Sequence, residues 1–304
     1  MKYLLVGLGN IGAKRLALLG DRCIGTVDPY NKEATYRDVR NCKPALFDAV
    51  ILSVPNQVKI ELIHYFLELG KHVLVEKPLL FPDESTAQHL AAIAKKNKAI
   101  CYTSYNHRFE PLIEEAKKEI DSGVLGKIYT GKLFYGNGTV AHVVGSWREE
   151  GLGVLEDLGP HLLDLAAFLF DDVRGIGINP LWLKRHESKA LDHCLLETED
   201  QRFLLETSFI SWKNNFKIEL YGEKGSLHLQ GLCKWGPSEL TICERIFPSG
   251  VPKERRKTIT GSDVTWKKDL DYFESAIAAG LSSFENDQWI SKVLRNLGPA
   301  SLPA

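Results

Sequence analysis

The first twelve residues, MKYLLVGLGNIG, constrain the fold of this chain more than any other stretch. The apolar run from Tyr3 to Val6 has strand character, and Gly7, Gly9 and Gly12 follow it in a G-x-G-x-x-G pattern. In dinucleotide-binding turns the first glycine permits the tight turn and the second lets the backbone approach a pyrophosphate. The third lets the next helix pack closely on the strand. The pattern therefore predicts a strand, a phosphate-binding turn and a helix.

The helix after the glycines is expected to begin near Ile11, where its first amides face the phosphates. Asn10 and Ile11 are therefore predicted cofactor contacts, together with the three glycines. A glycine-rich turn without a ligand is the alternative interpretation of this stretch alone.

Asp28 follows the second expected strand, 23–27, and lies nineteen residues after Gly9. A carboxylate there can accept hydrogen bonds from the ribose hydroxyls, and it would repel a 2′-phosphate. The sequence thus favours NAD over NADP, although Lys32 nearby can soften that preference, so NADP stays possible. The alternative role of Asp28 is that of a turn former before Pro29.

The bulk composition is that of a globular protein with two domains: 304 residues, 44% hydrophobic and 25% charged. A formal net charge of -1 gives no reason to expect nucleic acid or an anionic membrane as partner. The six cysteines are scattered without a C-x-x-C pair, which argues against a metal site and indicates reduced packing residues. No long apolar segment is present, and we expect a cytoplasmic protein.

The hydrophobic periodicity changes once along the chain. Up to Ser122 strands alternate with helices, which predicts a doubly wound parallel sheet in residues 1–122. From Gly126 short runs alternate apolar and polar residues, which predicts an α+β domain with a mostly antiparallel, open-faced sheet in residues 123–304. Among its elements we expect a strand near 173–178, a helix over 157–170, a charged turn or edge at 255–257, and a helical tail over 263–297.

Two turns are expected at the carboxyl ends of the parallel strands, where such sheets bind ligands. Pro55 and Asn56 follow the strand at 49–54, and Glu76, Lys77 and Pro78 follow the strand at 71–75. The Lys77 ammonium can donate a proton to a carbonyl or, with a lowered pKa, accept one from a hydroxyl. Pro78 makes a cis peptide plausible. The alternative for Lys77 is a surface lysine paired with Glu76.

The run from Gly151 to Asp164 carries polar residues in an otherwise apolar helix. If the helix reaches back to Asp157, then Asp157, His161 and Asp164 share one face. His161 can exchange a proton while Asp157 positions substrate or orients the imidazole. Helix capping by Asp157 and a packing role for His161 are the alternatives.

In these motifs the chain resembles the Gfo/Idh/MocA family of oxidoreductases. The matching pieces are GLGNIG at 7–12, the Glu76-Lys77-Pro78 turn, YNHRF at 105–109, the D-x-G-x-H-x-x-D run at 157–164 and LYGEKGSL at 220–227. They occur in the family's order over nearly the whole length. Two departures are Leu152, inside what is often an unbroken glycine run, and Lys59, where a histidine often follows the P-N turn.

The resemblance implies a Rossmann domain and a carboxyl-terminal open-faced sheet that builds homodimers or homotetramers. It implies hydride transfer between a nicotinamide and a hydroxyl or keto carbon of a sugar, cyclitol or nucleotide sugar. It places Lys77, Asp157 and His161 on catalytic positions, and either Lys77 or His161 exchanges the hydroxyl proton. The candidate substrate contacts are Asn106, Arg108, Trp147 and Arg148; an arginine pair suits a carboxylate or phosphate, and Trp147 can stack on a sugar or pack.

Two other classes of protein fit the sequence. A glycosidase that uses tightly bound NAD in a redox-assisted elimination would produce no net NADH. A non-catalytic regulator would bind the dinucleotide without needing Lys77, Asp157 and His161 together.

Overall fold

The computed structural model describes residues 1–138 and 140–298, which separate into two compact units. The first unit comprises Met1–Asn106 with Trp266–Ser291, and the second comprises His107–Thr265 with the segment from Lys292 onward. The sequence analysis divides the chain at 122/123 instead. The apolar stripe of a helix specifies that one face is buried, but it does not specify which domain covers that face.

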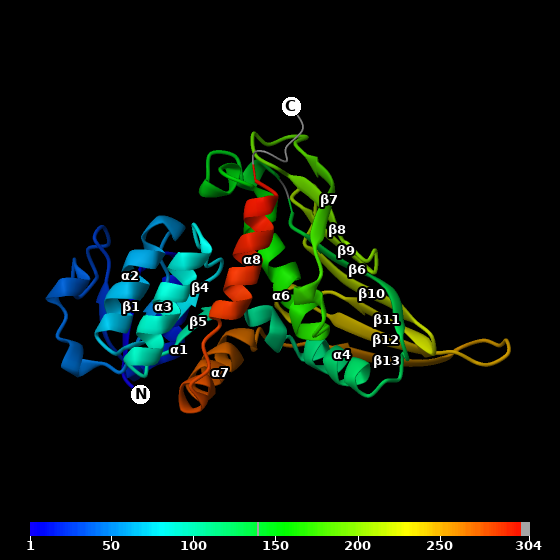
Figure 1. The fold of residues 1–304 in the computed structure, drawn as a ribbon, viewed down its shortest axis with the longest axis horizontal. Helices are drawn as coiled ribbons and strands as arrows, with labels where there is room; N and C mark the ends of the chain where they lie inside the picture. Colours follow the sequence, from blue (N-terminus) through cyan, green and yellow to red (C-terminus); the bar gives the residue numbers. More distant parts are fainter. Residues whose placement is uncertain (139, 299–304) are drawn as a thin grey trace. The chain divides into compact units, whose positions relative to one another are not determined.

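The first unit contains a five-stranded sheet among the described residues, in the order β2-β1-β3-β4-β5 with every neighbouring pair parallel. The strands are β1 (Tyr3–Val6), β2 (Cys23–Val27), β3 (Ala49–Leu52), β4 (His72–Glu76) and β5 (Cys101–Ser104). The helices are α1 (Asn10–Leu19), α2 (Asn56–Glu68), α3 (Glu84–Lys96) and most of α7 (Thr265–Ala279) (Figure 1). Asp83 caps α3, where its carboxylate accepts from Thr86 N.

Successive residues of the parallel strands are buried on opposite faces of this sheet. On one face Leu4, Val50 and Val73 pack in a cluster with Phe66 of α2 and Leu90 of α3. On the other face, Tyr3, Leu5 and Ile51 pack with Leu19 of α1 and Phe273 of α7. Continuous apolar strands are needed where helices cover both faces of a sheet. The predicted doubly wound sheet is confirmed.

The second unit is built on a sheet in which the described residues supply eight strands, in the order β13-β12-β11-β10-β6-β9-β8-β7. Neighbours are antiparallel except for β6 and β9, so the predicted mostly antiparallel sheet is confirmed. Its strands are β6 (Ile128–Gly136), β7 (Ile178–Lys184), β8 (His193–Thr198), β9 (Phe203–Ser208), β10 (Asn215–Gly222), β11 (Gly225–Gln230), β12 (Ser238–Glu244) and β13 (Lys253–Ile259). The helices α4 (Pro111–Asp121) and α6 (Gly159–Leu169) pack against one face of it (Figure 1).

Several predicted elements differ from the observed ones. The strand expected near 173–178 is wrong: a 3₁₀ turn, η7 (Val173–Gly175), stands there and β7 begins at Ile178. The helix expected over 157–170 is interrupted at Leu158, between α5 (Val154–Asp157) and α6. The helical tail is two helices, α7 and α8 (Phe284–Asn296), and the charged run at 255–257 lies in the edge strand β13.

Arg15 of α1 is the largest fully buried side chain of the first unit. Its guanidinium donates to Glu76 Oε1 at the end of β4 and to Asp269 Oδ2 of α7, both at 2.8 Å. It also donates to Ser104 Oγ at 2.6 Å and lies under the Trp266 ring. A buried cation needs such partners, since an uncompensated charge is costly to desolvate. These bonds connect the first helix, two strand ends and the returning helix α7.

Replacing Asp269 tests this cluster. Asp269→Ala leaves the Arg15 charge partly uncompensated, and we expect it to lower the free energy of unfolding by about 3–5 kcal/mol. Asp271→Ala on the same helix is the matched control: Asp271 forms an exposed i,i+4 pair with Lys267, and about 0.5 kcal/mol is expected. Urea unfolding followed by circular dichroism measures both. Equal losses would contradict the assigned role of Asp269.

Candidate functional site

The glycine turn has the geometry that its sequence pattern predicts. Gly7 has φ +92°, a backbone conformation that favours glycine. A Cβ on Gly12 would lie 2.0 Å from Gly7 O, so only glycine lets α1 approach β1 this closely. A Cβ on Gly9 would meet no described atom within 4 Å. The space beside Gly9 and the first amides of α1, which no side chain caps, suit a pyrophosphate.

Asp28 is tied to the same turn by its carboxylate. Oδ2 accepts from Leu8 N at 2.8 Å, and Oδ1 accepts from Tyr30 N and Asn31 N at 2.9 Å. Partial burial acts to raise the pKa of Asp28, but these N–H donors and Arg37 lower it overall. The carboxylate is therefore held ionised. It keeps lone-pair capacity for a ribose hydroxyl, because two carboxylate oxygens offer about four acceptor sites.

Lys77 directly follows β4 and is half-buried, and its peptide bond to Pro78 is cis, as expected. Glu76, which precedes Lys77, pairs with the buried Arg15. The buried Lys59 of α2 donates to the carbonyl oxygens of Glu76 at 2.6 Å and Pro78 at 2.7 Å. The departure from the family pattern at residue 59 thus has a structural role: its ammonium fixes the backbone on both sides of Lys77.

Pro55 and Asn56 occupy the predicted turn after β3. Pro55 precedes α2 and is exposed, and Asn56 is the first residue of that helix. Both therefore lie at the carboxyl edge of the parallel sheet, as Lys77 does after the neighbouring strand β4.

His161 lies in the first turn of α6 and is buried in the second unit. Its ring centroid is 3.9 Å from that of His107 and 5.8 Å from that of Tyr135 on β6. His107 and Tyr135 were not among the predicted site residues. His107 belongs to the YNHRF stretch, but no spacing rule joins it to His161, which lies 54 residues later in the sequence.

The helix break at Leu158 separates Asp157 from His161, so the three residues do not share one continuous helix, whereas His161 and Asp164 lie three residues apart in α6. Asp157 ends α5 and accepts from Arg148 Nε at 2.8 Å. Asp164 accepts from both Nε and Nη2 of Arg108, a bidentate pair. Two of the predicted substrate contacts are thus held in ion pairs with carboxylates of this helical segment.

The other two predicted substrate contacts are placed differently. Asn106 is buried in the turn η4 (Asn106–Phe109), at the end of the first unit. Trp147 lies in η6 (Trp147–Glu149), and its side chain lies outside the described part of the structure.

Lys234, in the turn η8 (Cys233–Trp235) between β11 and β12, joins the histidine cluster. Its Nζ lies 3.1 Å from His107 Nε2 and 3.2 Å from the Tyr135 hydroxyl, and 4.9 Å from the Trp235 ring centroid. Although the residue as a whole is exposed, protein groups surround its ammonium, and this desolvation lowers the pKa of Lys234. The carboxylates of Glu110, Asp263 and Asp157 act to raise that pKa but do not outweigh the desolvation. Nothing in the sequence around a lysine in a turn indicates that it contacts a histidine distant in the sequence.

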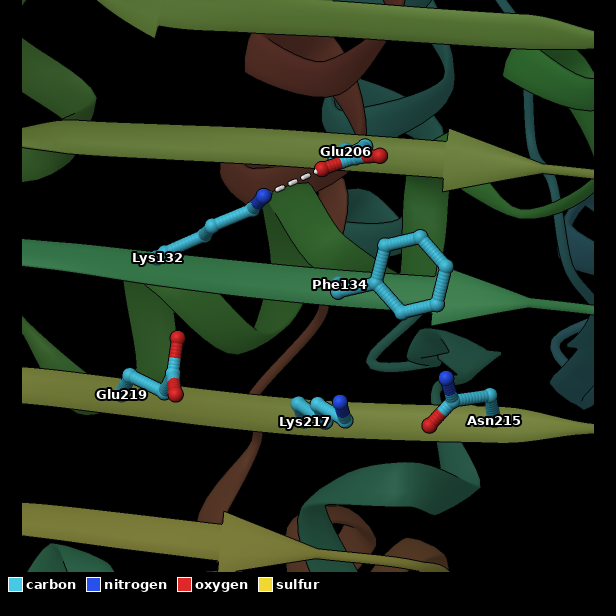
Figure 2. A pocket seen from close by; sticks show the side chains of 6 residues that line it. All are labelled: Lys132, Phe134, Glu206, Asn215, Lys217 and Glu219. Atoms are coloured by element: carbon cyan, nitrogen blue, oxygen red, sulfur yellow. Dashed lines mark ion pairs between the residues drawn. The ribbon is translucent and has the colours of Figure 1, made fainter. Parts of the chain in front are cut away.

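A hollow on the sheet of the second unit is lined by residues that were not among the predicted site residues. Figure 2 shows six side chains from β6, β9 and β10 around it, and Lys132 pairs with Glu206 at 2.5 Å. Its lining residues are Lys132, Phe134, Glu206, Asn215, Lys217 and Glu219. They include no histidine or cysteine.

Within residues 1–138 and 140–298, no group of three or more histidine, cysteine, aspartate or glutamate side chains is arranged to hold a metal ion. No helix in the same residues is long and apolar enough to cross a membrane.

Comparison with known proteins identifies the chain's family. Residues 1–105 match the model described as the oxidoreductase family, NAD-binding Rossmann fold, and residues 113–228 match the GFO/IDH/MocA C-terminal domain. The chain belongs to the Gfo/Idh/MocA family of oxidoreductases. The resemblance expected from the motifs is confirmed.

Two curated Gfo/Idh/MocA relatives match part of the chain. It is 28% identical over 189 residues to the uncharacterized oxidoreductase YdgJ of Escherichia coli, covering 61% of this chain and 54% of that protein. It is 26% identical over 194 residues to scyllo-inositol 2-dehydrogenase (NADP(+)) IolW of Bacillus subtilis, and this match covers 62% of this chain and 53% of that protein. The chain thus spans about half the length of these relatives.

A solved structure extends the likeness over both units. The putative NADPH-dependent oxidoreductase of Desulfitobacterium hafniense aligns with a TM-score of 0.82 at 19% identity, covering 100% of this chain and 96% of that one. At this identity the likeness shows the fold.

Asp28→Asn tests the cofactor side of the site. The substitution keeps an acceptor oxygen for the loop and removes the negative charge that would repel a 2′-phosphate. We expect wild-type protein to bind NADH about tenfold more tightly than NADPH and the variant to lose most of that difference. Fluorescence titration with both cofactors measures the ratio, and Asp21→Asn on the exposed η1 turn (Gly20–Arg22) is the control. An unchanged ratio would remove Asp28 from cofactor selection.

Lys59→Met tests the support of the Lys77 turn. Two carbonyl groups lose their donor, and we expect the free energy of unfolding to fall by about 2–3 kcal/mol. The matched control is Lys71→Met, since Lys71 donates to one carbonyl, Phe47 O, and is only partly buried; about 1 kcal/mol is expected there. Denaturant unfolding measures the free energy of unfolding of both variants. A smaller decrease for Lys59→Met than for Lys71→Met would contradict the role of Lys59 in supporting the Lys77 turn.

Proposed function

We propose that this chain is an NAD(P)-dependent oxidoreductase that transfers a hydride between the nicotinamide and a hydroxyl or keto carbon of a carbohydrate-like substrate. The observation that carries the proposal is the position of Lys77. It follows a central strand of the parallel sheet, at the edge where doubly wound sheets bind ligands. The residues on both sides of Lys77 are held in place. Lys59 donates to the carbonyl oxygens of Glu76 and Pro78, and Arg15 donates to the Glu76 carboxylate.

The cofactor fits the glycine turn and Asp28. Gly7, Gly9, Asn10, Ile11 and Gly12 would cradle the pyrophosphate, and Asp28 would bind the ribose. Pro55, Asn56, Glu76 and Lys77 would border the nicotinamide end. When bound, the cofactor accepts or supplies the hydride. We propose NAD as the preferred form because of the Asp28 carboxylate, whereas the Bacillus relative is named for NADP(+).

The proton and the substrate are assigned to this chain's own side chains. In the oxidising direction Lys77 or His161 takes the proton of the hydroxyl whose carbon loses the hydride, which leaves a ketone and balances the reaction. Asp157, held by Arg148, would orient the substrate or the imidazole. Asn106, Arg108, Trp147 and Arg148 would line the substrate. An anionic group would have to share Arg108 and Arg148 with Asp164 and Asp157.

Membership of the family supports the proposed substrate class. The Bacillus relative is named as an inositol dehydrogenase, and we propose a polyol, hexose or nucleotide sugar for this chain. Self-association through the sheet of the second unit, whose hollow carries the Lys132–Glu206 pair (Figure 2), is part of the same proposal.

Lys77→Ala tests the assigned chemistry. Loss of the ammonium removes a proton-transfer or polarising group, so we expect turnover to fall by about 10²–10⁴-fold while the Kd for NADH changes by less than about twofold. A screen of polyols, hexoses and nucleotide sugars, followed at the NADH absorbance band, supplies the substrate. The control is Lys95→Ala, on the exposed last turn of α3.

Three outcomes would contradict parts of the proposal. Unchanged turnover in Lys77→Ala would remove the lysine from the mechanism. Tight cofactor binding with no absorbance change for any substrate would favour a binding protein instead, and glycoside cleavage without net NADH would favour the redox-assisted glycosidase.

A further inference from the structure

The ammonium of Lys234 is a cation in contact with His107, whose ring packs against that of His161 in the second unit. An ammonium has only donors, so at 3.1 Å it requires His107 Nε2 to be the acceptor. His107 then carries its single proton on Nδ1. The His107 ring in turn lies 3.9 Å from the His161 ring, measured between centroids.

We propose that Lys234 is a positioning residue that acts through His107 to hold the His161 imidazole neutral and oriented for proton transfer. This inference rests on the proposed function of His161. A neutral imidazole is the form that accepts a proton from a hydroxyl. A positive charge nearby disfavours the protonated ring.

The other charged groups described near the histidines in the second unit do not disfavour a protonated His161. The two arginines nearest in sequence to the histidines are neutralised by carboxylates, Arg108 by Asp164 and Arg148 by Asp157. Glu110, which accepts from Cys233 N, and Asp263 act in the opposite direction, because carboxylates favour a protonated imidazole. Tyr135 is uncharged near neutral pH.

The contacts of Lys234 hold its charge in place. Its Nζ also lies 3.2 Å from the Tyr135 hydroxyl, and Tyr135 itself lies 5.8 Å from His161 between ring centroids. The Trp235 ring packs beside the ammonium and Tyr135. A single side chain in the β11–β12 turn thus contacts both aromatic neighbours of His161.

The test is a histidine titration by NMR together with a pH–rate profile. In Lys234→Met the midpoints of His107 and His161 should rise by about one pH unit, and Lys234→Arg should restore most of the shift. The acidic limb of kcat/KM should move upward by the same amount, because a higher pH is then needed to obtain the neutral base. Assignment of the resonances uses His107→Gln and His161→Gln.

Lys217→Met is the matched control, because Lys217 lies in the hollow on the sheet rather than beside the histidines (Figure 2); neither midpoint should move. Unshifted midpoints in a folded Lys234→Met variant would overturn the inference, as would shifted midpoints with an unmoved acidic limb. Shifted midpoints in a protein that oxidises no substrate would support the electrostatic role of Lys234 and contradict the proposed function.

Discussion

The buried guanidinium of Arg15 is the interaction on which the first unit depends. It bonds Glu76, Ser104 and Asp269 at once, so it joins α1, the ends of β4 and β5, and α7. A desolvated cation cannot be moved without breaking these bonds, and its partners therefore keep one arrangement. Since Glu76 immediately precedes Lys77, the same bonds limit the movement of the turn that carries the candidate catalytic lysine.

Charge compensation recurs at several polar groups of the two units. Lys59 is satisfied by two carbonyl groups, Asp28 by three N–H donors, and Asp157 and Asp164 by arginines. Each pairing fixes a backbone segment as well as a charge. Lys59 and the residues whose N–H groups donate to Asp28 thus hold predicted site residues without being predicted site residues themselves. The arginines that pair with Asp157 and Asp164 are themselves predicted substrate contacts.

Much of the fold could be predicted because it follows from local patterns. Gly7, Gly9 and Gly12 indicate a turn, and its geometry requires glycine at positions 7 and 12. The change from helical to alternating periodicity at Gly126 separates the parallel from the antiparallel sheet. The misplaced strand at 173–178 and the helix break at Leu158 show the limit of such patterns. A short apolar run fits a 3₁₀ turn as well as a strand, and Pro160 is tolerated in a first helical turn.

The sequence by itself determined the family, the Rossmann turn, and the positions of Lys77, Asp157 and His161 along the chain. Only the tertiary structure decided what those side chains contact. His107 and Tyr135 pack against His161 from separate segments, and Lys234 contacts both of them from a third segment. Asp269 bonds Arg15 from the far end of the chain. Local periodicity specifies which face of an element is buried, whereas the partner on that face depends on packing between residues distant in sequence.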